Sequence, residues 1–153
     1  MYRVAIFLLL SGIAVFGNTD NTVNCKHNTI KIPYTVWIGD EINYGSTIEV
    51  YAEPNSTFYQ VMLIAAKANK YFEFKATNTT FGHYITKIAG VRENVKENIY
   101  WFIYNLTHAP DMRNPPTECQ LSPVGVDSLL VSKDHHYLFW WRHWKNDSSI
   151  YIN

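Results

Sequence analysis

The stretch that decides the fold is TFYQVMLIAAKANK, at residues 57–70. Its apolar residues recur every three or four positions, which is the spacing of one face of an α-helix. Pro54, Asn55 and Ser56 combine a helix breaker with an N-cap position just before it. We therefore predict one main helix over residues 57–70 that packs on a sheet. The residues expected to face that sheet are Phe58, Val61, Met62, Ala65, Ala68 and Phe72.

The sequence before this helix has the two-residue period of β-strands. Residues 29–38 (TIKIPYTVWI) and 47–52 (TIEVYA) alternate between apolar and polar side chains. Gly39 follows the first of these runs and begins a turn, so the pair predicts a hairpin closed by residues 39–46. Pro33 lies inside the first run, and because proline lacks the N–H of a ladder it predicts an edge strand or a bulge.

The sequence after the helix returns to the two-residue period. Further strands are predicted at residues 71–76, 82–88, 98–106 and 136–144. An early hairpin, one helix and several later strands form an α+β fold with the helix on one side of the sheet. We predict a single β-grasp-like domain with an antiparallel or mixed sheet.

Length and charge exclude several classes of protein. The chain has 153 residues, with 13 Lys and Arg against 13 Asp and Glu. A balanced charge gives no global basic field for nucleic acid or an anionic membrane. Only 17% of the residues are charged and 47% are hydrophobic, which argues against a largely disordered chain. One soluble domain without a nucleic-acid partner is therefore expected.

The first residues have the pattern of a secretory signal. Arg3 precedes a short apolar run, and Gly17 offers a small residue at its exit. We predict a signal peptide at residues 1–17, a flexible arm at 18–28 and the folded domain at 29–153. The alternative is a buried N-terminal strand or helix. No other segment is long and apolar enough to span a membrane, so the protein is expected outside the cell.

Two further features fit an extracellular protein. Four Asn-x-Ser/Thr sequons predict N-glycosylation at Asn55, Asn78, Asn105 and Asn146. The chain has only two cysteines, Cys25 and Cys119, and an oxidising compartment favours one disulfide between them. Two free buried thiols are the alternative.

The sequence carries no recognisable catalytic or metal motif. It has no G-x-S-x-G elbow, H-E-x-x-H helix, phosphate-binding loop or dinucleotide fingerprint. His135 and His136 are adjacent, so on a strand their rings point to opposite faces and cannot chelate one ion. Asp127 has the context of a residue that closes a turn. We expect no enzyme, no metal and no resident cofactor.

The aromatic content, 16% of the residues, needs an explanation. One alternative is ordinary packing in the core and on the sheet. The other is a flat apolar platform on the sheet face opposite the helix, or at its edge, that binds a large ligand or a partner. Trp140 and Trp141 are adjacent, so on a regular strand they cannot both face the core.

Several segments together carry a family resemblance. The ordered series comprises the helix (residues 57–66), F-E-F (72–74), G-H-Y-I-T-K-I-A-G (82–90), Y-W-F (100–102) and L-S-P-V-G-V-D (121–127). It resembles the C-terminal β-domain of the cobalamin carriers transcobalamin, intrinsic factor and haptocorrin, and covers roughly residues 29–144. The same domain also occurs alone in small secreted invertebrate proteins.

This resemblance implies an α+β unit whose loops and edge cover one side of a corrinoid. The implied ligand-binding residues are Gly82, His83, Tyr84, Tyr100, Trp101 and Phe102. A strand that carries Gly125, Val126 and Asp127 would support them.

Two departures from the family pattern affect the functional expectation. The carriers add a helical barrel that supplies much of the ligand shell and, in some members, a cobalt-ligating histidine, and this sequence shows no such barrel. Carriers often have Gln where this chain has Phe102. We therefore expect a secreted, non-enzymatic module that binds cobalamin or a related corrinoid as a half-site. The alternative is an extracellular interaction or matrix protein that binds a protein or glycan partner through its Trp-rich segment, residues 138–144.

Overall fold

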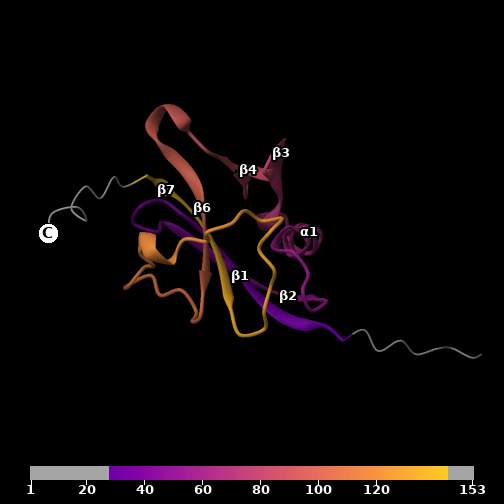
Figure 1. Cartoon of the computed structure of the whole chain (residues 1–153). Coiled ribbons are helices and arrows are strands. Elements are labelled where there is room, and N and C mark those ends of the chain that lie inside the picture. The colour runs from indigo at the N-terminus through magenta and orange to yellow at the C-terminus, as the bar shows by residue number, and fades with distance from the viewer. Residues whose placement is uncertain (1–27, 145–153) are drawn as a thin grey trace, which may run out of the picture.

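The computed structural model describes residues 28–144 (Figure 1). The one α-helix among these residues is α1 (Phe58–Ala68). The strands are β1 (Ile30–Ile38), β2 (Tyr44–Ala52), β3 (Phe74–Thr79), β4 (Gly82–Ile88), β5 (Val91–Arg92), β6 (Ile99–Leu106) and β7 (His136–His143). Three short 3-10 turns complete the order: η1 (Lys70–Phe72), η2 (Val95–Glu97) and η3 (Glu118–Gln120).

The strands form two open sheets. The larger sheet has the order β2-β1-β7-β6, in which β1 and β7 run parallel and the other neighbours antiparallel. The smaller sheet has the order β3-β4-β5. The predicted hairpin is the β1–β2 pair, and it leads directly into α1. The fold is therefore a single α+β domain with a β-grasp-like mixed sheet, as the sequence predicts.

The proline in β1 lies where the sheet tolerates it. β1 is a central strand, so the prediction of an edge strand is wrong for the element as a whole. The pairing with β7 begins only at Tyr34, however, and Pro33 is paired with Glu49 of β2 alone. At Pro33, β1 therefore has only β2 as a neighbouring strand, and the lack of an N–H on proline removes no hydrogen bond to β7.

The helix begins at a capping box. The Thr57 hydroxyl accepts from the Gln60 backbone N–H at 3.3 Å, and the Gln60 side chain accepts from the Thr57 N–H at 2.8 Å. The loop at residues 122–131 supplies further acceptors, since the N–H groups of Phe58 and Tyr59 donate to the carbonyls of Leu129 and Val126. This loop is therefore fixed to the start of the helix. It forms no strand at Gly125 to Asp127, so that expectation is wrong.

Most of the predicted helix face is buried. Phe58, Val61, Met62 and Ala65 lie in the core, whereas Ala68 is exposed at the last turn, contrary to the prediction. Phe72 is also fully buried, but it belongs to the 3-10 turn η1 and not to the helix. The strand predicted over residues 71–76 therefore starts only at Phe74, and it continues to Thr79.

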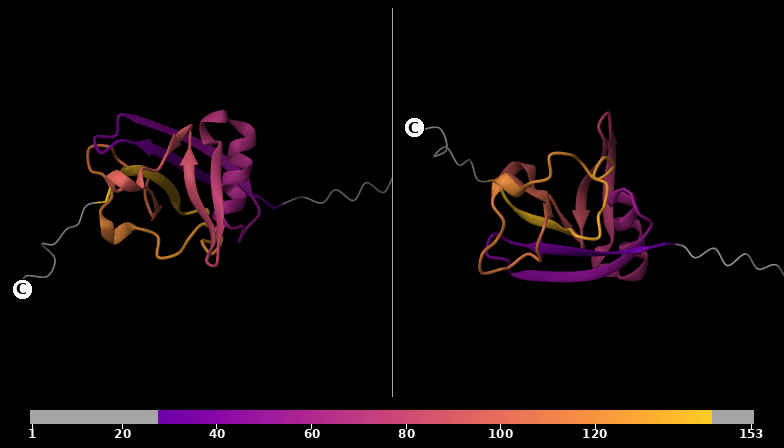
Figure 2. Two further views of the ribbon diagram at one scale, coloured as in Figure 1. Left: turned by 90° about the horizontal axis from the view of Figure 1, so that it is seen from above. Right: turned by 60° about the horizontal axis from the view of Figure 1, so that its bottom comes forward.

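A second, smaller core lies on the sheet face away from α1. It contains Trp37, Tyr104, Leu106, Leu138 and Trp140. The long connection between β6 and β7 contributes Leu121 to it. Figure 2 shows that the first part of this connection lies away from the helix, whereas its residues 122–131 return to the start of α1. Trp37 and Trp140 are 1% and 4% exposed, so the apolar platform predicted on this face is wrong for both of them.

Several predictions fall outside the described residues. These are the signal peptide, nearly all of the N-terminal arm, Cys25 and Asn146. Within the described part of the chain, no helix is both long and apolar enough to cross a membrane.

Candidate ligand-binding site

The first part of the site is the turn into β4. Gly82 has a φ of +100°, a conformation that side chains strongly disfavour. A Cβ atom at this position would lie 2.5 Å from Oδ2 of Asp127. Glycine therefore allows both the backbone turn and the close approach of the Asp127 carboxylate.

The Asp127 carboxylate contacts both the backbone and the ring of His83. The backbone N–H of His83 donates to Oδ2 at 2.5 Å, and its ring Nδ1 lies 2.9 Å from Oδ1. Burial raises the pKa of Asp127, but the hydrogen bonds from the backbone and ring of His83 outweigh it and lower this pKa overall. A carboxylate at Nδ1 favours the tautomer with the proton on that nitrogen and leaves Nε2 as an acceptor.

Tyr59 of α1 fixes the plane of the histidine ring. The two rings stack with centroids 3.9 Å apart and an interplanar angle of 11°. Both residues line an open groove of about 590 Å³ between α1 and the smaller sheet. The rest of its lining is mostly apolar and comprises Leu63, Ala66, Glu73, Phe74, Ala76 and Asn78.

The second part of the site is formed by Tyr84 of β4 and its neighbours Glu93 and Tyr100. Tyr84 is 43% exposed, and its hydroxyl donates to the Glu93 carboxylate at 2.5 Å. Burial first, and then the hydrogen bond to Glu93, raise the pKa of Tyr84, and the nearby Tyr100 adds to the effect. The phenol therefore stays neutral and is oriented by Glu93, with Tyr100 beside it.

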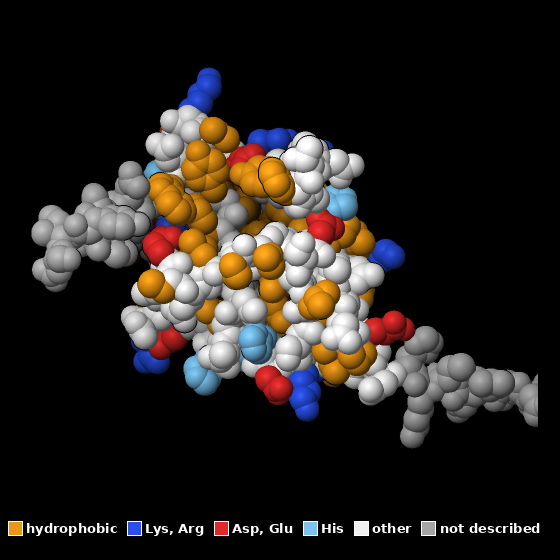
Figure 3. All heavy atoms as spheres, viewed as in Figure 1, with side chains coloured by type: hydrophobic (Ala, Val, Ile, Leu, Met, Phe, Trp, Pro, Cys, Tyr) orange, Lys and Arg blue, Asp and Glu red, His pale blue; other side chains and the backbone are white. Residues whose placement is uncertain are grey.

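An aromatic strip continues from Tyr84 along β6. We define it as Tyr84, Tyr100, Phe102 and Trp144. Tyr100 meets Phe102 edge-on at 6.1 Å between ring centroids, and Phe102 stacks on Trp144 at 5.5 Å. Tyr84 and Trp144 are 43% and 48% exposed, and the other two are half-buried. In Figure 3 hydrophobic side chains gather near the top of the molecule, where Figure 1 places the β4 and β6 labels.

Arg142 supports the strip from beneath. Its guanidinium carbon lies 4.4 Å from the Phe102 ring centroid, and the side chain is buried. Tyr104 and Glu118 accept hydrogen bonds from the guanidinium at 2.6 and 2.5 Å. These contacts hold Phe102 toward solvent on a rigid base.

The six predicted ligand-binding residues therefore lie in three places. Gly82 is in the turn that leads to His83, which lines the groove beside α1, whereas Tyr84, Tyr100 and Phe102 belong to the aromatic strip. Trp101 points to the other face of β6, where it is 7% exposed and donates from Nε1 to the Val91 carbonyl at 3.2 Å. It is part of the main core.

Sequence reasoning missed the residues that orient these groups. They are Tyr59, Glu93 and Arg142, and Asp127 is predicted in a turn and on a supporting strand but not as the partner of His83. Asp127 and His83 are 44 positions apart, so no local pattern links them. Trp144 is predicted only as part of the Trp-rich segment, in which Leu138 and Trp140 prove to be buried.

The disulfide and the N-glycosylation sites remain predictions. Cys119 is exposed on η3, and Cys25 is outside the described residues, so their pairing is untested. Asn55 and Asn78 are exposed, while Asn105 is half-buried with its Oδ1 2.6 Å from Nδ1 of His135. Between residues 28 and 144, no three His, Cys, Asp or Glu side chains are grouped closely enough to hold a metal ion.

Comparisons with known proteins add a family context. No protein-family model matches the chain. An uncharacterized protein of Drosophila melanogaster is 31% identical over 127 residues, which are 83% of this chain and 21% of that protein. The cobalamin binding intrinsic factor of Rattus norvegicus is 33% identical over 63 residues, or 41% of this chain and 15% of that protein.

A solved structure shares the fold. Haptocorrin, in complex with Cbi, superposes with a TM-score of 0.63 at 23% sequence identity, over 78% of this chain and 26% of that one. The chain thus spans about a quarter or less of the length of each of these proteins. It has a fold in common with haptocorrin and shares part of its sequence with intrinsic factor, which supports the predicted resemblance to the β-domain of the cobalamin carriers.

Proposed function

We propose that this chain is a non-enzymatic binding module and that its aromatic strip forms one wall of a site for cobalamin or a related corrinoid. The observation that carries the proposal is the continuity of the strip. Tyr84, Tyr100 and Phe102 come from two different strands, and each was expected at the ligand from the resemblance alone. Intrinsic factor is named for cobalamin binding, which supports the same ligand class.

The chemistry of the strip suits a large ligand with an apolar rim and amide arms. Aromatic faces contribute buried area, and the Tyr84 hydroxyl and Glu93 carboxylate offer polar contacts at its end. His83 adds a ring nitrogen at the neighbouring groove. Both surfaces are open, so a bound corrinoid would keep one side uncovered unless another domain or chain supplied the second wall.

The position of Phe102 sets the expected strength of binding. Where carriers often have an amide, this chain offers a ring held by Arg142. A polar arm of the ligand would find no partner there, and that loss costs affinity. We propose weak binding by the isolated chain, in the micromolar range or above.

Equilibrium dialysis of the full chain against cobalamin tests the proposal. We expect saturable binding of one ligand per chain, weakened roughly tenfold by Tyr84→Ser because an aromatic contact is removed. The matched control is Tyr51→Ser on β2, a tyrosine that is 60% exposed and outside the strip. Absence of binding at millimolar cobalamin, or equal affinities of the two variants, would contradict the proposal.

We also propose that the protein is secreted and N-glycosylated. The support is the predicted signal at residues 1–17 and the exposure of Asn55 and Asn78, which glycan attachment requires. Mass spectrometry of the protein from the medium of expressing cells tests this. We expect an N-terminus after Gly17, glycans at both asparagines and a Cys25–Cys119 bond. An intact Met1 and unmodified asparagines in cell-retained protein would contradict it.

A further inference from the structure

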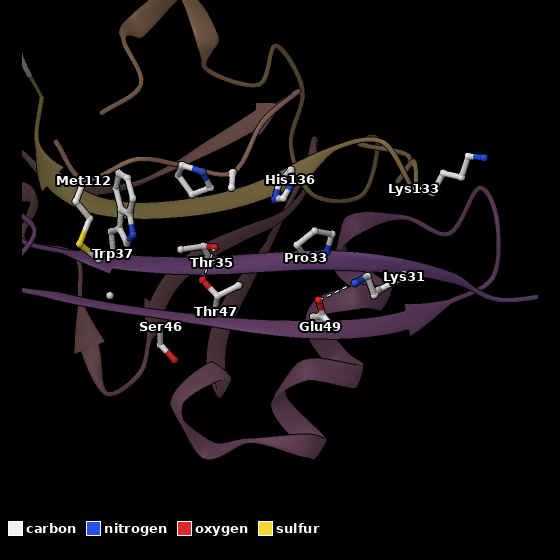
Figure 4. Close-up of a pocket in the computed structure, with 13 residues that line it drawn as sticks. Lys31, Pro33, Thr35, Trp37, Ser46, Thr47, Glu49, Met112, Lys133 and His136 are labelled. Carbon is white, nitrogen blue, oxygen red and sulfur yellow. Dashed lines mark hydrogen bonds and ion pairs between the residues drawn. The ribbon is translucent and has the colours of Figure 1, made fainter. Parts of the chain in front are cut away.

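A second groove lies on a different face of the domain from the site described above. It has a volume of about 460 Å³ and shares no lining residue with the groove beside His83. β1 and β2 form its floor, while β7 and residues 109–112 form its wall (Figure 4). Ile32, Tyr34 and Val36 belong to the core beneath α1. Strand alternation therefore turns the odd-numbered residues of β1 into this groove.

One end of the groove is apolar. Trp37 lies at this end with Met112 beside it, as Figure 4 shows. Gly45 makes the arrangement possible, because a Cβ atom there would lie 2.5 Å from Cε of Met112 and 3.0 Å from Trp37. Met112 itself is 52% exposed and Trp37 is 1% exposed, so the flexible Met112 thioether covers the buried indole and forms the accessible surface at this end.

The other end of the groove is cationic. Lys31 forms an ion pair with Glu49 at 2.8 Å, and Lys133 and His136 stand beside it (Figure 4). Lys133 has no ion pair or hydrogen bond within residues 28–144. The two ammonium groups and one carboxylate that line the groove leave one net positive charge. Between the two ends, the hydroxyls of Thr35 and Thr47 are 2.8 Å apart.

His136 reports the positive potential at this end. Its pKa is lowered first by burial and then by the nearby basic groups of His108, His135 and Lys31. Its imidazole therefore stays neutral near pH 7 and can donate to an oxyanion from one ring nitrogen. An anion placed among these groups would relieve the mutual repulsion of the cations.

We propose that this groove binds a small amphipathic carboxylate. Its head group lies between Lys133, Lys31 and His136, and its apolar body runs along Pro33 toward Met112, which lies beside the buried Trp37. The net charge of the lining matches a single carboxylate, and the apolar end matches a hydrocarbon or aromatic body. This ligand class is independent of the corrinoid and of the aromatic strip.

Octanoate is the probe that tests this site, followed by NMR of the full chain labelled with ¹³C at its methionine methyl groups. Met112 lines the groove, while Met62 is fully buried beneath α1 and serves as the internal control. We expect the Met112 signal to shift in a saturable way while the Met62 signal stays fixed. No shift of Met112 at ten millimolar octanoate, or equal shifts of both methyl groups, would overturn the proposal.

Two ligands separate the contributions of the head group and the body. Acetate carries only the carboxylate and 1-octanol only the hydrocarbon, so each should bind at least several-fold more weakly than octanoate. Equal binding of 1-octanol would overturn the role of the cations, and equal binding of acetate would overturn the role of the apolar end.

A charge reversal tests the cationic end. Lys133→Glu changes the net charge of the lining from plus one to minus one, and we expect octanoate affinity to fall at least about fivefold. Lys96→Glu, on η2, is the matched exposed control and should bind like the parent chain. Equal affinity of the two variants, both shown to be folded by their urea transitions, would overturn the assignment.

Discussion

At the scale of single residues, Gly82 combines two constraints that can be separated by mutation. A side chain there meets an unfavourable φ of +100° and also the Asp127 carboxylate at 2.5 Å. Gly90 has a φ of +82° but no atom within 4 Å of its would-be Cβ. The second glycine therefore isolates the cost of the backbone conformation alone.

We predict that Gly82→Ala lowers the free energy of unfolding by about 2–4 kcal/mol, and Gly90→Ala by only about 1 kcal/mol. Urea denaturation of both variants measures the difference. Gly82→Ala should also weaken the hydrogen bond from the His83 backbone N–H to Asp127, seen as faster hydrogen exchange of the His83 amide. If the two substitutions cost the same, the close approach of Asp127 to residue 82 is wrong.

The carboxylate of Asp127 also gives stability a pH dependence. Its folded-state pKa is lowered, because the hydrogen bonds from His83 outweigh its burial. A depressed pKa contributes stability at pH values above the unfolded value of about 4 and loses it as pH falls through the folded value. This contribution should therefore be present at pH 7 and disappear in strong acid.

We predict that the unfolding free energy of Asp127→Asn falls less steeply than that of the parent chain as the pH is lowered from about 5 to the lowest pH at which the protein is still folded. Asp134→Asn, at an exposed position in the loop before β7, is the control and should keep the parent slope. Urea transitions recorded across this pH range provide the measurement. Parallel pH profiles of Asp127→Asn and the parent chain would show that the His83 contact has no thermodynamic weight.

Individual roles were the least predictable part of the site. Gly82, His83 and Tyr84 follow from a recognisable segment, but the partner of each ring lies elsewhere in the chain. Asp127 comes from a loop fixed to the start of α1, and Arg142 comes from the last strand. Contacts between residues so far apart in the sequence produce no recognisable local pattern, so the orienting residues can be identified only in the folded structure.

At the scale of elements, β7 and the residue that follows it carry tryptophans with different structural roles. Trp140 is 4% exposed and donates from its indole nitrogen to the Gly39 carbonyl at 2.8 Å, which ties β7 to the turn after β1. Trp144 lies one residue beyond the strand, is 48% exposed and stacks on Phe102. One ring belongs to the second core and the other to the aromatic strip.

We predict that Trp140→Ala lowers the free energy of unfolding by about 3–5 kcal/mol, because it leaves a large cavity and removes the indole hydrogen bond to the Gly39 carbonyl. Trp144→Ala should cost less than about 1 kcal/mol. Urea denaturation of the two variants makes the comparison. A greater loss of stability for Trp144→Ala than for Trp140→Ala would reverse the roles assigned to these residues.

Elements with strong periodicity were predicted well for a physical reason. α1 buries one face, and alternate residues of the β1–β2 hairpin point toward α1, so the apolar spacing of these elements is visible locally. The region of residues 69–73 was predicted less well, because Phe72 can reach the core from a 3-10 turn as easily as from a strand. The loop that carries Asp127 contributes Val126, Leu129 and Val131 to the core. Their alternating spacing resembles that of a strand, and for this reason a strand was predicted where the structure has a loop.

At the scale of the whole molecule, both faces of the larger sheet are packed. The main core fills the side of α1, and the smaller core fills part of the other side beneath the long connection. Composition shows that the chain is rich in aromatic rings but cannot say which of them the connection covers. The broad platform was therefore overestimated, although the aromatic strip and the two grooves described above are accessible to solvent.

The central claim is that the aromatic strip, and not the buried tryptophans, meets the corrinoid. Titrating cobalamin into the full chain with ¹⁵N-labelled indoles tests it most directly. The account predicts that the Trp144 indole signal shifts progressively with ligand, whereas the signals of Trp37 and Trp140 remain in place. Shifts of Trp37 and Trp140 with a stationary Trp144, or no shift of any indole at millimolar cobalamin, would contradict it.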